Sequence, residues 1–516
     1  MKGLAIGRSQ LSDILQENAV YVDKTEYIHK LMHFAGKRYF LSRPRRFGKS
    51  LLIDTIKEVF LGNKKLFADL WIGQEGRHDW RQRPVIVLDF ANINLDSLET
   101  IKESLFRNIV ALATVHHIAV TAKNAIDALN EIVPVMAQRE KVVLLVDEYD
   151  APLLKHITNV SLAQDIRSYL SNFYTTIKTL DAYWYLLFIT GISKFSKTSI
   201  FSCMNNLKDI SFDSSMAGIC GYTQEELEDS FSEHIQAQMR IMKKTREKLL
   251  DELRFWYNGY RFSKDALRVY NPFSILLFFK KQDFGNYWFA SGTPTFLIDL
   301  MNKGEGYNPT FFKGKRYGEG VFNSFEIDTI SLLPLMYQSG YITIQRAFSG
   351  RTYSFTYPNE EVRQSLFECL ATAFLEAMPE AVNPSFEIMR TAVHTGDVRG
   401  LYAGMKAVLA TVPARLHNQN EAYYHSLLHV MCMGIGYAQS EVATSKGSID
   451  LVLGTTKYTY VIEIKLNKSA EVALAQIHKR RYYEKYATEG KMVFLVGMAF
   501  DFATKQLTYT YEKMGA

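Results

Sequence analysis

Two acidic side chains and a lysine near the C-terminus have the types and spacing of a metal-dependent site that cuts phosphodiesters. Asp450 ends a short segment that begins at Gly447, and Glu463 and Lys465 alternate within an apolar run at residues 461–465. Alternate residues of a strand point to one face, so Glu463 and Lys465 would share a face. Two carboxylates can hold Mg²⁺, and a lysine can stabilise charge on a phosphate. An ordinary acidic strand end is the alternative interpretation.

Two polar residues on neighbouring expected helices could complete this site. Glu421 could join the metal shell or order a water, and Gln476 could turn inward to the same place. The helix that carries Gln476 also has basic residues with tyrosines between them, which suits a phosphate backbone and unstacked bases. A solvated helix whose tyrosines belong to the core is an equal alternative. The residues concerned are His478, Lys479, Arg480, Arg481, Tyr482, Tyr483, Lys485 and Tyr486.

A second phosphate-handling signature lies some 400 residues upstream, at Gly48-Lys49-Ser50. A P-loop needs backbone N–H groups around the phosphates, a lysine that reaches the terminal phosphates and a hydroxyl for Mg²⁺. The usual first glycine would fall at Arg43, so the pattern GxxxxGK[ST] fails at one position. The tripeptide nevertheless opens an expected helix directly after an expected strand. We expect the nucleotide to bind at Arg43, Pro44, Arg45, Arg46, Phe47, Gly48, Lys49, Ser50 and Leu51.

Acidic and polar residues at the ends of two later strands extend this nucleotide site. Asp147 and Glu148 follow the apolar run at residues 142–146. Asp147 could hold the Mg²⁺ together with Ser50, and Glu148 could polarise the attacking water. Thr190 and Ser193 end the next apolar run, where a polar side chain could sense the γ-phosphate. A simple strand-to-loop turn is the alternative at these last two positions.

The chain therefore needs elements that place two sites far apart in sequence. Strands are expected at residues 38–41, 85–90, 142–146 and 183–190, with helices between them, which indicates a parallel sheet covered on both faces. Helical sequence follows from about residue 221. A helix and a hairpin at residues 331–357 suggest a winged-helix element. From residue 421 we expect helix, two strands, a helix at 470–486 and two more strands.

Composition limits the class of protein without choosing a function. The 516 residues favour two to four domains, and a net charge of +6 permits a nucleic-acid partner without requiring one. The cysteines Cys203, Cys220, Cys369 and Cys432 lack metal-ligand spacing and suggest reduced thiols in a cytoplasmic protein. The N-terminus has no signal-peptide pattern, and no run approaches the ~20 apolar residues of a membrane span. We expect no membrane partner.

The motifs together resemble a bacterial family that joins an AAA-like or STAND-like ATPase domain to a C-terminal PD-(D/E)xK nuclease-superfamily domain. The resemblance covers essentially the whole chain, and the family also has arginine where Arg43 stands. The position before Ile449 is often arginine in the family and is Ser448 here, which could remove one phosphate contact. The matching segments are residues 21–25, 43–50, 146–150, 190–196, 256–260, 270–274, 447–450 and 463–465.

The resemblance implies an α/β multidomain protein. It would contain a P-loop NTPase parallel sheet at residues 1–220, a helical lid region at 221–320, a winged-helix-like region at 321–380 and a restriction-endonuclease-like α/β domain at 381–516. ATP and Mg²⁺ are the expected cofactors, and nucleic acid, DNA in the first instance, is the expected partner. AAA-like relatives often assemble into rings, so a homo-oligomer is also considered.

Three functions follow from these observations. The first is an ATP-dependent or ATP-gated nuclease in which Asp450 and Glu463 bind a second Mg²⁺ and Lys465 assists hydrolysis. The second is a nucleotide-controlled switch whose C-terminal domain binds a partner or nucleic acid without cutting, which Ser448 and the modest basic charge favour. The third is a simple ATPase with a structural C-terminal domain.

Overall fold

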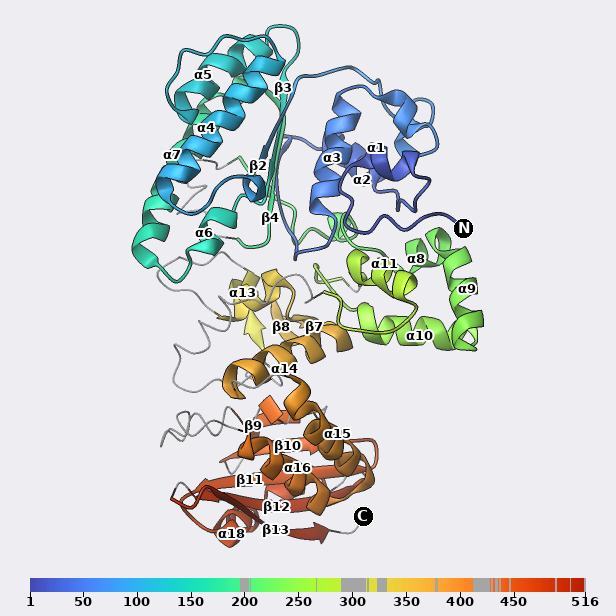
Figure 1. Cartoon of the computed structure of the whole chain (residues 1–516), viewed down its shortest axis with the longest axis vertical. Helices are drawn as coiled ribbons and strands as arrows, with labels where there is room; N and C mark the ends of the chain where they lie inside the picture. Colours follow the sequence, from blue (N-terminus) through green and yellow to red (C-terminus); the bar gives the residue numbers. More distant parts are fainter. Residues whose placement is uncertain are drawn as a thin grey trace. The chain divides into compact units, whose positions relative to one another are not determined.

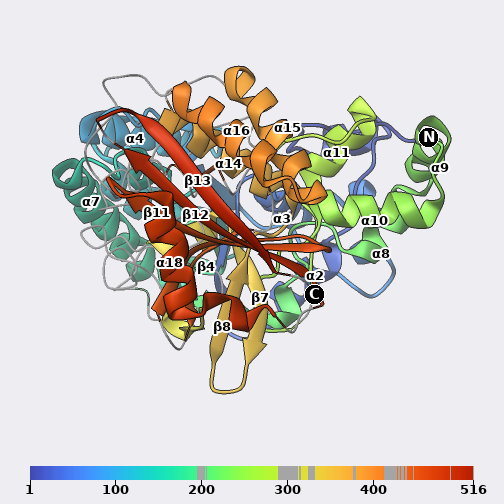
Figure 2. The same ribbon diagram turned by 90° about the horizontal axis from the view of Figure 1, so that it is seen from below.

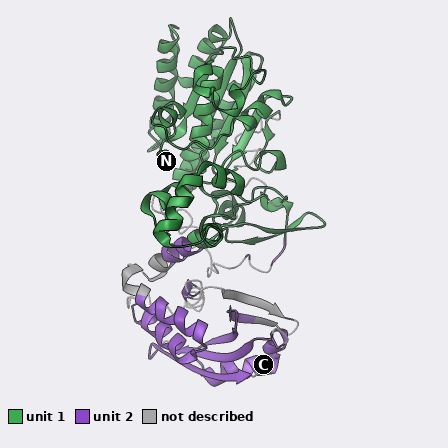
Figure 3. Cartoon of the chain, turned by 90° about the vertical axis from the view of Figure 1, so that its right-hand side faces the viewer, with its two compact units in different colours: residues 1–291, 317–362 green, residues 292–316, 363–516 purple. Residues whose placement is uncertain are grey.

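The computed structural model describes residues 1–194, 206–265, 267–288, 315–322, 332–375, 379–411, 438–444, 447–487, 490–501 and 503–514, together with a few isolated positions. The chain forms two compact units, Met1–Ser291 with Tyr317–Val362, and Gly292–Arg316 with Arg363–Ala516 (Figure 3). The four-domain division expected from the sequence stays a prediction. No helix in the described part of the chain combines the length and apolar character needed to cross a membrane.

Unit 1 is built on a parallel sheet with the strand order β2-β3-β4-β1-β5. Apolar sequence explains the burial, because every residue of β1 and of β3 is buried. The expected strands at residues 38–41, 85–90, 142–146 and 183–190 are therefore confirmed within a residue or two. The strand bounds are β1 (Arg38–Ser42), β2 (Val85–Asp89), β3 (Val142–Asp147), β4 (Trp184–Gly191) and β5 (Lys208–Asp209).

Helices cover both faces of this sheet, as uninterrupted apolar strands require. One face carries α1 (Leu11–Gln16), α2 (Thr25–His33) and α3 (Lys49–Phe60), and the other carries α4 (Leu98–Val115), α5 (Ala125–Met136) and α7 (Val160–Thr179) (Figure 1). The short α6 (Ala151–Lys155) follows β3. In open parallel sheets ligands bind beyond the carboxyl ends of the strands, which is where the P-loop candidate and Asp147 lie.

The rest of unit 1 is a helical region and a small sheet. Thr223 and Glu226 form a capping box at the start of α8, in the region expected to be helical from about residue 221. The helices are α8 (Gln224–Ser230), α9 (Ser232–Met242), α10 (Arg246–Tyr257), α11 (Pro272–Lys281) and α13 (Leu332–Ser339). The sheet has the order β6-β8-β7, with β6 (Tyr317–Gly318), β7 (Thr343–Phe348) and β8 (Thr352–Thr356). The expected helix and hairpin are present, and their assignment as a winged helix stays a prediction.

Unit 2 has a mixed sheet in the order β13-β12-β11-β10-β9, in which β11 and β12 are parallel and the other neighbours antiparallel. Figure 2 shows α15 and α16 on one side of this sheet and α18 on the other. The helix α14 (Glu360–Leu375) begins in unit 1 and continues into unit 2. The other bounds are α15 (Pro379–Thr395), α16 (Val398–Ala410), β9 (Ala438–Thr444), β10 (Gly447–Gly454), β11 (Tyr458–Leu466), α18 (Ala470–Arg480), β12 (Met492–Asp501) and β13 (Gln506–Met514).

Candidate functional sites

The phosphate loop joins β1 to α3 and ends in a glycine that the backbone requires. Gly48 has φ 87°, the left-handed conformation that glycine adopts without strain, and a Cβ there would meet no atom within 4 Å. Lys49 begins α3 and is buried, and its Nζ donates to the carbonyls of Arg43 and Pro44 at 3.1 Å. The loop therefore gathers a lysine and a helix N-terminus, both of which attract phosphate.

Asp147 and Ser50 meet at the carboxyl end of β3. Asp147 is 3% exposed, and burial raises its pKa to about 6 even though a hydrogen bond from Ser50 and the charge of Lys49 oppose this shift. A carboxylate and a hydroxyl that are already together beside a lysine fit a Mg²⁺ bound with a triphosphate. The residues present are thus suited to the expected ion.

Glu148, the residue after Asp147, has a strained backbone. Its φ is 48°, an uncommon value for a residue with a side chain, and its N–H donates to Asp147 Oδ1 at 3.0 Å. Such outliers cost about 1–3 kcal/mol and are concentrated at functional sites. The strained backbone is consistent with the water-polarising role expected for Glu148, which also lines the cavity described next.

A cavity of about 570 Å³ opens beside the phosphate loop. Its loop side includes every residue from Arg45 to Leu51, and Lys24, whose Nζ is paired with Glu226 at 2.6 Å, also lines it. Its other walls include Ala5, residues 7–9, residues 20–22 and residues 219–222, and also Pro272, Phe273 and Leu276. The cations of the loop, together with the apolar and aromatic side chains among the other lining residues, match a nucleotide, which has a charged phosphate chain and a flat base.

Asp89 and Asn92 also line this cavity, and sequence reasoning missed them. Asp89 ends β2 directly opposite Asp147 in the parallel register. Its carboxylate accepts hydrogen bonds from Asn92 Nδ2 at 2.6 Å and from the N–H of Ala91, while burial and the nearby Glu148 raise its pKa. The signal was available, because the expected strand at residues 85–90 contains an acid near its end.

The structure does not bring the side chain of Arg43 to the cavity, contrary to the expectation for a nucleotide contact. Arg43 is 1% exposed, and its guanidinium donates to the carbonyls of Ser42, Ser211 and Met216 and lies 4.2 Å from the ring centroid of Phe262. Pro44 is likewise buried and is not among the residues that line the cavity. The carbonyls of these two residues accept the hydrogen bonds from Lys49 Nζ.

Thr190 and Ser193 also differ from the expected γ-phosphate sensors. Both are fully buried, and neither lines the cavity. The hydroxyl of Ser193 donates to Asp150 at 2.6 Å, and the backbone N–H groups of Ser193 and Ile192 donate to the same carboxylate. Asp150 therefore fixes the turn after β4, and this turn corresponds to the strand-to-loop alternative.

The second candidate site lies where β10 and β11 run antiparallel. Leu451 pairs with Ile462, so Asp450 and Glu463 occupy the next positions of the two strands. Asp450 Oδ2 accepts the N–H of Ile464 at 2.8 Å, and Lys465 Nζ donates to Glu463 Oε1 at 2.8 Å. The structure thus brings the two carboxylates and the lysine together, and Glu463 and Lys465 share a face as alternation predicts.

Glu463 is the most perturbed group at this second site. It is 1% exposed, and burial followed by repulsion from Asp450 raises its pKa to about 7, against the opposing effect of Lys465. Its Oε2 is buried and has no hydrogen-bond partner among the described residues. A buried carboxylate oxygen without a partner, beside a second carboxylate, fits a divalent cation.

Gln476 reaches this site from α18, where its Nε2 donates to Glu463 Oε1. Base stacking by the neighbouring tyrosines is not supported, because Tyr482 and Tyr486 are buried and pack in the core of unit 2 with Ile477. Their ring faces are covered by that packing, so the core alternative is correct for both. Glu421 lies outside the described residues, and its expected role stays a prediction.

Both candidate metal sites rest on few protein ligands. No group of three or more His, Cys, Asp or Glu side chains in the described part of the chain is arranged to hold a metal ion. Mg²⁺ commonly keeps several waters and binds through one or two carboxylates plus substrate phosphates. This mode of Mg²⁺ coordination is compatible with two pairs, Ser50 with Asp147 and Asp450 with Glu463.

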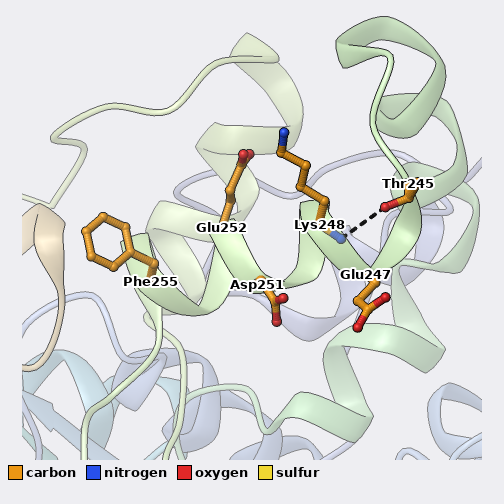
Figure 4. Close-up of a pocket in the computed structure, with 6 residues that line it drawn as sticks. All are labelled: Thr245, Glu247, Lys248, Asp251, Glu252 and Phe255. Atoms are coloured by element: carbon orange, nitrogen blue, oxygen red, sulfur yellow. Dashed lines mark hydrogen bonds between the residues drawn. The ribbon is translucent and has the colours of Figure 1, made fainter. Parts of the chain in front are cut away.

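A separate hollow of about 400 Å³ lies along the first turns of α10 and its cap. Figure 4 shows its six lining residues, with the N–H of Lys248 donating to the Thr245 hydroxyl at 3.3 Å. That bond is an ordinary N-cap, and Phe255 at the far end is 56% exposed. Neither site residue set overlaps this hollow, and we assign it no chemistry.

Comparisons with known proteins agree with the two-site description. The family model described as "Predicted AAA-ATPase" matches residues 5–201, and that of the PD-(D/E)XK nuclease superfamily matches residues 419–509. A protein of Azotobacter chroococcum mcd 1, described as "Uncharacterized protein in vnfD 5'region", is 35% identical over 531 residues, covering 100% of this chain and 99% of the relative. No solved structure gave a significant match. The chain therefore belongs to the family that joins an AAA-ATPase-like domain to a C-terminal domain of the PD-(D/E)XK nuclease superfamily.

Proposed function

We propose that this protein binds and hydrolyses ATP in unit 1 and uses it to control a Mg²⁺-dependent nuclease in unit 2 that acts on DNA. The observation that carries the proposal is the presence, in one chain, of two separate sets of buried carboxylates beside a lysine. These are Asp147 with Lys49 and Glu463 with Lys465. Each set can hold Mg²⁺ through its carboxylate and stabilise charge on a phosphate through its lysine.

In unit 1, Lys49 would exchange its bonds to the loop carbonyls for the terminal phosphates of ATP. Ser50 and Asp147 would hold Mg²⁺, and Glu148 would orient and deprotonate the attacking water. The ion would neutralise charge on the phosphate oxygens. Arg45 and Arg46 are exposed where they line the cavity and add positive charge that favours a triphosphate.

In unit 2, Asp450 and Glu463 would hold a second Mg²⁺. Lys465, already within hydrogen-bond distance of Glu463, would stabilise the charge that develops on the scissile phosphate. Gln476 would keep Glu463 oriented through its hydrogen bond to Oε1. The partnerless Oε2 of Glu463 is then the atom left to bind the ion.

The test is cleavage of labelled single- and double-stranded DNA and RNA with Mg²⁺ or Mn²⁺, with and without ATP. Asp450→Asn should abolish cutting, whereas Glu471→Gln, which alters an exposed acid of α18, should not. Lys49→Ala should remove the effect of ATP, with the exposed Lys64→Ala as its matched control. Intact nucleic acid under every condition would contradict the nuclease and favour a switch that binds without cutting.

A further inference from the structure

One residue far from the P-loop in sequence is bonded to the backbone of that loop. The indole N–H of Trp288 donates to the carbonyl of Arg45 at 3.2 Å, across 243 positions of the chain. Trp288 is 7% exposed, and its ring lies 5.2 Å from that of Tyr341 and 6.5 Å from that of Tyr260. Packing on these rings fixes the indole, so the hydrogen bond has a defined direction.

This hydrogen bond orients a peptide unit of the phosphate loop. A peptide is planar and trans, so holding the carbonyl of Arg45 also sets the direction of the N–H of Arg46 on the opposite side of the plane. Arg46 has φ 67° and lines the cavity. Backbone N–H groups of such loops are the donors that surround phosphates. Trp288 thus orients a peptide group whose N–H is a candidate donor to a bound phosphate.

The same residue is bonded to a buried carboxylate at the start of α14. The backbone N–H of Trp288 donates to Glu361 Oε1 at 2.8 Å, and that of Tyr287 donates to the same oxygen at 2.7 Å. The hydroxyl of Ser274 donates to both oxygens, at 3.0 and 2.8 Å. Glu361 is fully buried, so this network has no water to replace a lost donor.

The first turn of α14 is therefore fixed inside unit 1. Asn359 Oδ1 accepts the N–H of Val362 at 3.0 Å, and Gly259 approaches Pro358 so closely that a Cβ would lie 1.9 Å from its carbonyl oxygen. Unit 1 ends at Val362, and α14 continues into residues of unit 2 from Arg363. The first turn of α14 thus belongs to unit 1, and the rest of the helix belongs to unit 2.

We infer that Trp288 is a positioning residue that holds the phosphate loop in its ATP-binding shape and couples that loop, through Glu361, to the first turn of α14. This inference rests on the proposed binding of ATP in unit 1. The inference goes beyond ATP binding because it names the contacts through which a bound nucleotide would affect α14, the helix that continues into unit 2. A bound phosphate chain restrains the Arg45–Arg46 peptide in this orientation, and the indole transmits that restraint to the Glu361 network.

The test is hydrogen–deuterium exchange of the full chain with and without ATP and Mg²⁺, together with direct titration of a fluorescent ATP analogue. In the wild type, ATP should slow exchange of the amides at residues 362–366 by about threefold or more. Trp288→Phe keeps an aromatic ring but loses the donor. It should bind the analogue ~5-fold more weakly, the worth of one hydrogen bond, and lose the effect of ATP on α14.

Two variants of Glu361 separate coupling from folding. Glu361→Gln keeps an oxygen for the two N–H donors and an amide for the Ser274 hydroxyl. ATP should therefore slow amide exchange in α14 of this variant as it does in the wild type. Glu361→Ala should bind the analogue within about twofold of the wild type, because the bond from Trp288 to Arg45 is kept. ATP should no longer slow amide exchange in α14 of this variant, because the hydrogen bonds to the Glu361 carboxylate are lost. Trp256→Phe, on α10 and stacked on Phe284, is the matched control and should transmit normally.

The outcomes are distinguishable. A wild type that does not bind the analogue overturns the proposed function and the coupling with it. If the wild type binds the analogue but ATP does not alter amide exchange in α14, the coupling alone is overturned. The same holds if ATP slows exchange in Trp288→Phe as much as in the wild type.

Discussion

Replacing Glu361 by Gln should make the folding stability of unit 1 less sensitive to pH. Glu361 is fully buried, and desolvation raises its pKa from the ordinary value of 4.5 to about 7, against the hydrogen bonds from Ser274, Tyr287 and Trp288. Between these two values the folded state holds a proton that the unfolded state has released. Folded stability therefore falls as pH rises through this window.

The size of the effect follows from the shift. Each pKa unit corresponds to 1.36 kcal/mol, so a rise from 4.5 to about 7 destabilises the folded state by roughly 3 kcal/mol once pH exceeds the upper value. Glutamine carries no charge and keeps the hydrogen-bond geometry. The variant should match the wild type within ~1 kcal/mol near pH 4.5 and be more stable by up to ~3 kcal/mol at pH 8.

The assay is denaturant unfolding followed by tryptophan fluorescence at several pH values, with Glu361→Gln measured beside the wild type. All other titrating groups are shared, so they cancel in the difference between the two proteins. Glu247→Gln, at an exposed position of α10, should give a difference that is flat with pH. A flat difference for Glu361→Gln as well would refute the reasoning, because it would mean that burial does not raise the pKa of this carboxyl.

Three further substitutions test separate parts of the structure. Gly259→Ala should destabilise unit 1 by more than about 2 kcal/mol in thermal unfolding, because φ is 120° and the new Cβ would lie 1.9 Å from Pro358 O. Arg43→Gly restores the usual P-loop glycine, yet it should destabilise by about 3 kcal/mol through three lost hydrogen bonds. Gln476→Ala removes a donor to Glu463, so the acidic limb of the cleavage pH profile should move up by roughly half a unit; an unmoved limb would contradict the proposed role of Gln476.

The elements and the core of each site were predictable because their signals are local. The helix expected to open at Gly48-Lys49-Ser50 is α3, the expected strand end carries Asp147, and Glu463 lies within β11. Gly48 adopts the left-handed conformation that a P-loop glycine supplies. A strand–loop–helix pattern and an alternating strand each fix side-chain direction within a few residues, so short motifs were sufficient.

The errors arose where packing between distant segments decides what a side chain touches. Thr190 and Ser193 have the right position for a phosphate sensor, but the carboxylate of Asp150, from the turn after β3, binds the N–H groups of Ile192 and Ser193 in the turn after β4. Tyr482 and Tyr486 lie among basic residues in sequence, yet their rings fill the core of unit 2. No local pattern distinguishes an aromatic ring in a core from one that stacks on a base.

The arginine at the first position of the phosphate loop shows how this family member forms a P-loop with a single glycine. A glycine gives a loop conformational freedom, which must then be lost when phosphate binds. Here Arg43 ties the start of the loop to the carbonyls of Ser211 and Met216, and Trp288 holds its middle at Arg45. Arg46 and Gly48 both have a left-handed backbone, with φ 67° and 87°, and of these two only the glycine adopts it without strain. The loop is thus shaped by its neighbours before any phosphate arrives, and under the proposed coupling Trp288 is the neighbour through which a bound nucleotide would act on the rest of unit 1.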